Sequence, residues 1–455
     1  MTGNVRQLRF SDLLFNRRGT FTYRFFLGVF DIALKLFFRR IETVNADRVP
    51  EKGGLIFVLN HPNGLIDPAL VFVALPRRIS FLAKSTLFRM PVISRILRMV
   101  EALPVYRRSD APEDIGKNQE TFTAARRLLA RGGSIALFPE GVSHNSPGLL
   151  PMKTGAARIA LGAAGVGRET VNVTIVPVGL FYTNKTTFRS EAMLYFGESF
   201  SVEPAEPDAD GEPPRAAVKE LTERIGTALR DVTLNAETEA ELATAQMAEQ
   251  IFVSAAGDPN LAERFDFLKD YIEERRTPDT LDDDLRTRLR DYDQKLDRRG
   301  LEAWHLSLAQ LTKGFIFRRA FIQVIPLLLL LPLSIAGTLL HFPAYQLCKI
   351  LAYYITRHGE DDIASTVKVL AAIIFMPLTW LILAAVTYFY FGWIYAAASM
   401  PLSFVCGYAA LYSLEEIEIL RGWAKAIWFF FTDRDTFLRL FVERRNLQRE
   451  LLETE

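Results

Sequence analysis

The chain has 455 residues, enough for two or more domains, and a formal net charge of +1. This balance gives no overall basic field, so the composition offers no case for nucleic-acid binding. Hydrophobic residues make up 49% of the chain, and their distribution along it therefore decides the class of protein. The two cysteines, Cys348 and Cys406, lie in apolar segments and give neither a disulfide framework nor a metal-binding motif.

Residues 1–47 are predicted to form an N-terminal amphipathic element at a membrane interface. The segment Phe21–Arg40 is aromatic and helical in period, but Arg24, Asp31 and Lys35 interrupt it. It is too polar for a membrane-spanning helix and fits one that lies in the interface, with its cations near the lipid headgroups. The alternative is a helix that packs on the core of the next domain.

Residues 48–235 are predicted to form an α/β domain with a mixed, largely buried sheet flanked by helices. Short apolar runs alternate there with helical stretches, which is the pattern of such a domain. The expected strands are Leu55–Leu59, Ile79–Ala83, Ser134–Phe138, Val173–Phe181 and Ala192–Phe196. The expected helices are Pro68–Leu75, Pro91–Val100, Gln119–Arg131, Lys153–Leu161 and Arg215–Leu234.

A histidine and an aspartate follow the first expected strand. His61 and Asp67 each precede a proline, which favours extended backbone at both, and Gly64 permits a turn between them. An imidazole can take a proton from an alcohol near neutral pH, while a carboxylate fixes its tautomer. The alternative is structural: Asp67 caps a helix whose first residue is Pro68, and His61 fills a polar loop. A zinc site is not expected, because no second histidine or cysteine lies at ligand spacing.

Two further polar groups lie in the same domain. Arg107 and Arg108 follow a short apolar run and fit a phosphate clamp, although surface charge is the favoured interpretation of the pair taken alone. The second group follows the strand Ser134–Phe138 and consists of Glu140, Gly141, Ser143 and Lys153. A carboxylate that accepts hydrogen bonds from hydroxyls, a glycine that lets backbone N–H groups approach, and a cation are suited to a phosphorylated polar substrate.

Residues 236–315 are predicted to be a charged helical insert. Its helices, Ala262–Arg276 and Asp282–Arg299, carry acids and arginines on most faces, as solvated helices do. We assign no chemistry to this insert.

Residues 316–414 are predicted to hold transmembrane helices. Ala320–Leu340 has no charged residue, and Val369–Tyr412 runs for 44 residues without a formal charge. The second stretch is long enough for two passes or a deep hairpin, with Gly392 or Ser399–Pro401 as its break. Three passes result, unless His341–Tyr354 is also embedded.

The ends of this region predict its orientation. Residues 415–455 are expected to form an amphipathic, arginine-rich tail. Arg318 and Arg319 precede the apolar region, and Arg421 and Lys425 follow it, which favours a cytoplasmic location for both ends and for the catalytic domain. Two cytoplasmic ends require an even number of passes, so the sequence leaves the number of passes open.

Four blocks in residues 48–200 resemble the glycerolipid acyltransferase family, whose members acylate glycerol-3-phosphate, dihydroxyacetone phosphate or lysophospholipids. A lysine present in many members also has a match here. In chain order the matches are His61 and Asp67, Lys84, Arg107, Phe138–Gly141 and Val176–Val178. The common motif has four residues between histidine and aspartate, whereas this chain has five. That gap and the Val142–Asn145 variant are similar to the fungal-type glycerol-3-phosphate acyltransferases, which also carry a helical insert and C-terminal membrane helices.

The resemblance implies acyl transfer without a covalent enzyme intermediate. His61, held by Asp67, would deprotonate the acceptor hydroxyl for attack on acyl-CoA or acyl carrier protein. Arg107, supported by Lys84 or Lys153, would bind the acceptor phosphate, and neither a metal nor a cofactor is needed. We further expect backbone N–H groups near Gly141 to stabilise the oxyanion. The implied partners are a lipid membrane, an acyl thioester and a phosphorylated glycerol.

Three alternatives remain at this stage. The acceptor can be lysophosphatidate or another lysophospholipid instead. The chain can be a catalytically silent lipid-binding membrane protein on the same fold. It can also be a serine hydrolase that uses Ser143, although the second glycine of a nucleophile elbow is missing.

Overall fold

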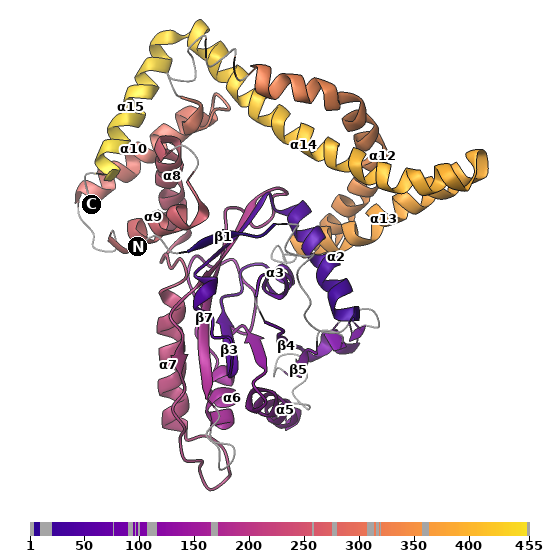
Figure 1. The fold of residues 1–455 in the computed structure, drawn as a ribbon. Coiled ribbons are helices and arrows are strands. Elements are labelled where there is room, and N and C mark those ends of the chain that lie inside the picture. Colours follow the sequence, from indigo (N-terminus) through magenta and orange to yellow (C-terminus); the bar gives the residue numbers. More distant parts are fainter. Residues whose placement is uncertain are drawn as a thin grey trace. The chain divides into compact units, whose positions relative to one another are not determined.

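The computed structural model divides the chain into two compact units, described separately below (Figure 1). The first unit holds Met1–Glu237, Leu261–Phe265 and Thr356–Val369, and the second holds Thr238–Asn260, Asp266–Ile355 and Leu370–Glu455. The structure describes residues 4–9, 21–75, 77–89, 94–95, 97–98, 101–106, 116–164, 172–256, 259–274, 280–306, 314, 318, 320–356 and 364–452. Most of the expected helix Pro91–Val100 lies outside these ranges.

The first unit is built on a mixed sheet of nine strands. In chain order these are β1 (Val5–Gln7), β2 (Arg40–Val44), β3 (Gly54–Leu59), β4 (Ser80–Lys84), β5 (Leu103–Val105), β6 (Ser134–Leu137), β7 (Val173–Tyr182), β8 (Glu191–Phe196) and β9 (Phe200–Ser201). Their order across the sheet is β1-β2-β8-β7-β3-β6-β4-β5, with β9 beside β7. The run from β7 to β5 is parallel, whereas β8 and β9 pair with β7 in antiparallel fashion. The predicted mixed α/β sheet is confirmed.

The centre of the sheet is buried on both faces. Every side chain from Leu55 to Leu59 in β3 is inaccessible to solvent, as expected for the continuous apolar run of a central parallel strand. On one face Ile56 and Val58 share a hydrophobic core with the helices α5 (Asn118–Ala130), α6 (Gly155–Ala164) and α7 (Arg215–Arg230). This packing holds the carboxyl ends of β3 and β6 at one edge of the sheet.

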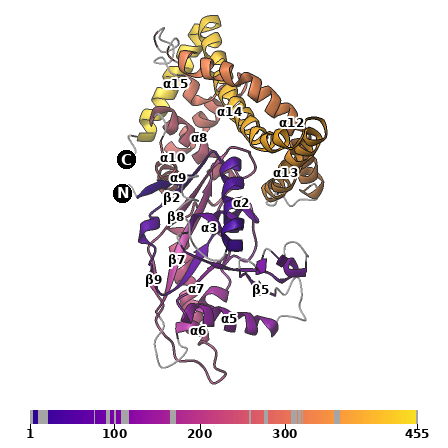
Figure 2. The same ribbon diagram turned by 45° about the vertical axis from the view of Figure 1, so that its right-hand side comes forward.

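The helices α2 (Phe21–Phe37) and α3 (Ile66–Ala74) pack against each other (Figure 2). The Tyr23 and Phe72 rings lie 4.9 Å apart. One face of α2 is buried, so the alternative of core packing is confirmed for that face. The opposite face leaves Phe21 86% and Phe25 59% exposed. The helix ends before Arg40, because Arg40 begins β2.

The second unit is helical. Its shorter helices are α8 (Glu239–Ala256), α9 (Leu261–Glu274), α10 (Thr280–Asp297) and α15 (Arg434–Leu452), and its long apolar ones are α12 (Ile325–Thr356), α13 (Ala364–Phe391) and α14 (Trp393–Thr432). Helices α9 and α13 each begin in the first unit and continue in the second.

Three helices in the described part of the chain are long and apolar enough to cross a bilayer: Phe321–Ile355, Thr366–Phe391 and Trp393–Thr432. The uncharged stretch breaks at Gly392, where φ is +89°. This confirms the first of the two break points that the sequence predicts. The other, Ser399–Pro401, lies inside α14. His341–Tyr354 belongs to α12 itself, so the first apolar segment is longer than the sequence pattern predicts.

Candidate active site

The histidine and the aspartate are hydrogen-bonded to each other. His61 follows β3, Asp67 lies in the first turn of α3, and Nδ1 of His61 is 2.8 Å from Oδ2 of Asp67. The Asp67 side chain is fully buried, whereas that of His61 keeps 15% of its surface exposed. Because a carboxylate only accepts hydrogen bonds, the proton lies on Nδ1, which leaves Nε2 free to accept one.

Two further donors hold the Asp67 carboxylate. The Asn63 backbone N–H donates to Oδ2 over 2.7 Å, and the Tyr182 hydroxyl at the end of β7 donates to Oδ1 over 2.6 Å. Burial raises the pKa of the Tyr182 phenol well above its usual value, and the Asp67 charge adds to the rise. The hydroxyl therefore keeps its proton and stays a donor at neutral pH.

The expectation that Asp67 caps its helix is wrong. The helix begins at Ile66 after the N-cap residue Leu65, so Asp67 is the second helical residue and Pro68 the third. Asp67 is consequently helical rather than extended. The first turn of a helix tolerates proline, because N–H groups there have no intrahelical partner. The carboxylate is turned toward His61 and does not cap the helix.

The loop after β6 packs directly on this pair. The Phe138 ring stacks on the His61 ring with centroids 4.0 Å apart and planes 15° apart, which restricts rotation of the imidazole. Oε1 of Glu140 accepts the His61 backbone N–H over 3.0 Å, and the His144 backbone N–H donates to the His61 carbonyl over 3.2 Å. The two blocks, 79 residues apart between His61 and Glu140, thus form one site.

Glu140 itself is fully buried and serves as a junction. Besides His61, it binds the Leu150 backbone N–H over 2.8 Å and Nε2 of His144. The Ser146 backbone N–H donates to Nδ1 of His144, so both ring nitrogens of His144 are engaged within this loop. His144 therefore has no free nitrogen to activate Ser143 as a hydrolase would require.

The loop also brings a cation close to Gly141. A Cβ on Gly141 would lie 2.5 Å from Nζ of Lys153, so the Lys153 side chain lies directly against the glycine. Gly141 has φ of +77°, and its N–H donates to the Phe138 carbonyl over 3.0 Å. The oxyanion role expected near Gly141 is therefore wrong for the Gly141 N–H, which is already used in a turn.

The remaining predicted residues fall in different places. Lys84 is the last residue of β4, which is separated from β3 in the sheet only by β6. Ser143 belongs to the loop of Glu140 and His144. Arg107 and Arg108 lie outside the described residues.

Sequence reasoning missed three residues that position the site. Asn60 fixes the start of the loop by exchanging two hydrogen bonds with the Leu180 backbone, of 2.7 and 3.1 Å. Tyr182 holds Asp67, and Thr366 accepts the Leu65 backbone N–H. The sequence signal for Tyr182 is a hydroxyl at the end of an apolar strand, which is too common to single it out.

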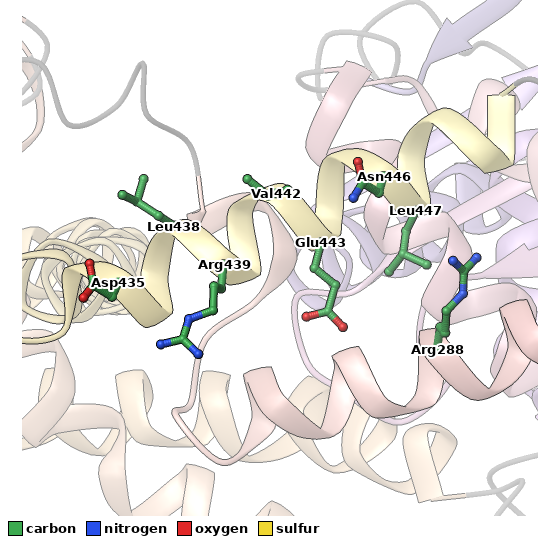
Figure 3. Close-up of a pocket in the computed structure, with 8 residues that line it drawn as sticks. All are labelled: Arg288, Asp435, Leu438, Arg439, Val442, Glu443, Asn446 and Leu447. Atoms are coloured by element: carbon green, nitrogen blue, oxygen red, sulfur yellow. The ribbon is translucent and has the colours of Figure 1, made fainter.

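An open pocket lies elsewhere, between α10 and α15 of the second unit (Figure 3). It has a volume of about 620 Å³ and is lined by both acidic and basic groups. Two of these pair across the helices, as Arg288 contacts Glu450 and Glu443 lies 2.7 Å from Lys295. Arg288 and Glu443 are thus paired, and no histidine is among the lining residues, so this pocket is not the candidate active site.

Comparison with known proteins identifies the domain that carries the site. Residues 40–180 match the acyltransferase family model, and this stretch includes both loops described above. These residues form an acyltransferase-family domain. Glycerol-3-phosphate O-acyltransferase 2 of Saccharomyces cerevisiae is 29% identical over 279 residues, 58% of this chain and 37% of the yeast protein. The chain thus spans little more than a third of that relative.

Two further matches are a relative that covers most of the chain and a solved structure. An uncharacterized acyltransferase of Schizosaccharomyces pombe is 23% identical over 532 residues, covering 94% of this chain and 78% of the relative. The crystal structure of the 1-acyl-sn-glycerophosphate acyltransferase PlsC from Thermotoga maritima aligns with a TM-score of 0.33 and 18% identity, over 49% of this chain and 86% of the other.

Proposed function

We propose that the chain is a membrane-bound O-acyltransferase that moves a fatty acyl group from an acyl thioester to glycerol-3-phosphate or dihydroxyacetone phosphate in phospholipid synthesis. The observation that carries this proposal is the 2.8 Å contact between His61 and a buried Asp67 within an acyltransferase-family domain. A relative named glycerol-3-phosphate O-acyltransferase supports the choice of acceptor.

In the proposed reaction the acceptor hydroxyl gives its proton to Nε2 of His61, and the oxygen attacks the thioester carbonyl. The Asp67 carboxylate stabilises the imidazolium that forms. When the tetrahedral intermediate collapses, the carbon–sulfur bond breaks and the thiolate takes the proton from His61. The products are an ester and a free thiol, and no acyl-enzyme, metal or resident cofactor is required.

The acceptor phosphate is assigned to the basic residues of the domain. Arg107 is the principal candidate, because a guanidinium matches phosphate geometry in two hydrogen bonds. Arg108, Lys84 and Lys153 supply further positive charge. Ser143 and the Glu140–Gly141 turn are proposed to contact the polar part of the acceptor.

We propose that the enzyme is a multi-pass membrane protein, and the three described helices long and apolar enough to cross a bilayer support this proposal. We propose that the catalytic domain faces the cytoplasm, since Arg421 and Lys425 follow the last apolar stretch. Acyl-CoA and acyl carrier protein both remain candidate donors.

A second candidate acceptor is lysophosphatidate. Proteins named 1-acyl-sn-glycerol-3-phosphate acyltransferase, from Borreliella burgdorferi and Bacillus subtilis, are 26% and 28% identical over shorter stretches. A silent lipid-binding protein is the alternative from another class, and the assembled His61–Asp67 pair weighs against it, because a binding protein needs no free, oriented imidazole nitrogen.

The test of the function is acyl transfer by the purified protein with labelled acyl-CoA and a panel of acceptors. His61→Ala should lower turnover by roughly 10²–10⁴-fold, the usual contribution of a general base, without unfolding the protein. Circular dichroism and the melting temperature check the fold. Near wild-type turnover of His61→Ala would exclude the mechanism, and transfer to no acceptor by the wild-type protein would favour the silent alternative.

The acceptor assignment has its own test in Arg107→Lys. A single ammonium replaces the guanidinium fork, so the KM for glycerol-3-phosphate should rise more than the KM for the acyl donor. The donor phosphates lie far from the thioester and should barely sense the change. Equal effects on both substrates, or a preference for an acceptor without phosphate, would contradict the assignment.

A further inference from the structure

The start of α13 belongs to the same compact unit as the sheet, although it lies 300 residues farther along the chain than the His61 loop. Thr366, in the first turn of α13, is buried, with 5% of its surface exposed. Its Oγ1 accepts the Leu65 backbone N–H over 3.0 Å. Leu65 is the N-cap residue of α3, so this contact holds the start of the helix that carries Asp67.

A second contact joins α13 to the same region. Nζ of Lys368 donates to the Thr186 carbonyl over 3.1 Å, in the loop between β7 and β8. The neighbouring Lys185 carbonyl accepts the Asn63 side chain over 3.1 Å, and Asn63 is the residue whose backbone N–H binds Asp67. Thr366 therefore contacts the N-cap residue of the helix that carries Asp67, and Lys368 contacts the neighbour of the residue that binds Asn63.

The sequence gives these two residues a defined place in α13. Lys368 is the last charged residue before the 44 uncharged residues Val369–Tyr412. The stretch Thr366–Phe391 has 26 residues, and an 18-residue window within it has a mean hydropathy of 2.5. A helix of 26 residues extends about 39 Å, more than the ~30 Å hydrocarbon core. A lysine at the end of such a span places its ammonium at the headgroups.

We propose that Thr366 and Lys368 are positioning residues, through which the first two turns of α13 hold the His61–Asp67 loop at the level of the lipid headgroups. The inference rests on the proposed function and deepens it. It assigns to the site a long-chain acyl thioester whose chain stays in the bilayer while its carbonyl reaches His61, and an acceptor that arrives from the water.

A purely structural role for Thr366 makes a different prediction. If its hydroxyl only stabilises the start of α3, loss of the contact lowers turnover equally with every acyl donor. If the hydroxyl instead fixes the distance of the His61–Asp67 loop from the membrane, loss of the contact lowers turnover most for a donor whose acyl chain stays in the membrane. A short-chain donor dissolved in water reaches His61 at any distance from the membrane, so its turnover changes little.

The first experiment compares palmitoyl-CoA with butyryl-CoA for the full-length protein reconstituted in vesicles of neutral and anionic phospholipid. Thr366→Val keeps the shape of the side chain but removes the acceptor, and should lower kcat with palmitoyl-CoA by roughly 3- to 10-fold, the effect of one lost hydrogen bond. The butyryl-CoA rate and the acceptor KM should stay within twofold. Thr366→Ser restores the acceptor and should restore the palmitoyl-CoA rate.

Thr379→Val is the matched control, because among the described residues the Thr379 hydroxyl bonds to the Phe375 carbonyl alone, one turn back in the same helix. It should leave both rates unchanged. An equal fall with the two donors in Thr366→Val, or no rescue by Thr366→Ser, would overturn the proposal.

The second experiment does not depend on activity. Val142 is partly exposed in the loop after β6 and can carry a fluorophore as Val142→Cys, once the buried Cys348 and Cys406 are replaced by alanine. Lipids that carry a spin label at the headgroup should quench this fluorophore more strongly than lipids labelled deep in the acyl chain. The double variant Thr366→Val with Lys368→Met should weaken the quenching by the headgroup label. No quenching by either lipid would overturn the positioning role. Strong quenching in a protein that transfers no acyl group would exclude the proposed function but leave the position of the loop at the headgroups supported.

Discussion

At the scale of single residues, the site depends on how the Asp67 carboxylate is held. One oxygen binds Nδ1 of His61 and the Asn63 N–H, and the other binds the Tyr182 hydroxyl. A buried carboxylate with all these donors has one preferred orientation, and this orientation fixes the tautomer of His61. In the proposed mechanism Tyr182 is therefore a positioning residue that acts through Asp67.

Tyr182→Phe should therefore impair turnover more than substrate binding. The change leaves one buried oxygen of Asp67 without a donor, which costs about 1–3 kcal/mol and corresponds to a fall in kcat of roughly 5- to 100-fold. KM should change little. Tyr292→Phe is the matched control, since the Tyr292 hydroxyl is buried without a hydrogen-bond partner in the described structure. A similar loss of kcat in both variants would indicate a general effect on folding.

At the scale of elements, an ion cluster joins the first strands to the start of α9 in the first unit. Glu191 begins β8, and its carboxylate lies 2.8 Å from Arg39, 3.1 Å from Arg40 and 2.8 Å from Arg264. Burial alone would raise the pKa of the Glu191 carboxyl, but the three arginines outweigh it, so that the pKa lies below its usual value of 4.5. The charged form is therefore favoured by folding.

This lowered pKa predicts how stability depends on pH. The contribution of Glu191 is complete above the unfolded pKa near 4.5 and is lost as the pH falls through the lower folded value. Glu191→Gln should lower the free energy of unfolding at pH 7 by about 3 kcal/mol, the lower end for breaking a buried pair, because Arg39 is half exposed. Chemical unfolding in detergent at pH 7 and pH 4 measures this. If the difference in the free energy of unfolding between variant and wild type is not smaller at pH 4 than at pH 7, the lowered pKa of Glu191 would be contradicted.

At the scale of the whole molecule, the apolar helices predict that part of the protein lies in lipid rather than in water. Large side chains such as Leu329, Phe389 and Trp393 are more than 70% exposed in the structure, and apolar surface of this extent along whole helices is unfavourable in water. The full-length chain should therefore stay with membranes through alkaline carbonate extraction and require detergent for purification.

Truncation after Thr312 removes all three spans and should convert the protein to a peripheral form that carbonate releases. Phe21 and Phe25 on the exposed face of α2 are expected to keep it on the membrane before extraction. Sedimentation followed by immunoblotting measures both forms. Recovery of the full-length chain in the soluble fraction without detergent would exclude membrane spanning.

The sequence by itself determined what depends on local pattern. Apolar runs such as Leu55–Leu59 predicted the central strands within about two residues, because burial on both faces requires an uninterrupted apolar run. Uncharged length predicted the membrane segments, and Gly392 was one of two candidate breaks between two of them, of which the structure selects Gly392. The His61–Asp67 pairing was also within reach, since only five residues lie between its members and a turn brings them together.

Only the tertiary structure decided what depends on register between distant segments. Tyr182 reaches Asp67 across 115 residues because β7 lies parallel to β3, with Val178 opposite Leu59. The contact of Thr366 with Leu65 crosses 301 residues. Helix capping by Asp67 stayed open as an alternative, because a sequence cannot show that a nearby histidine and a distant tyrosine each bind one oxygen of this carboxylate. Local chemistry sets which groups a residue can bind, whereas strand order and helix packing select the partner that it meets.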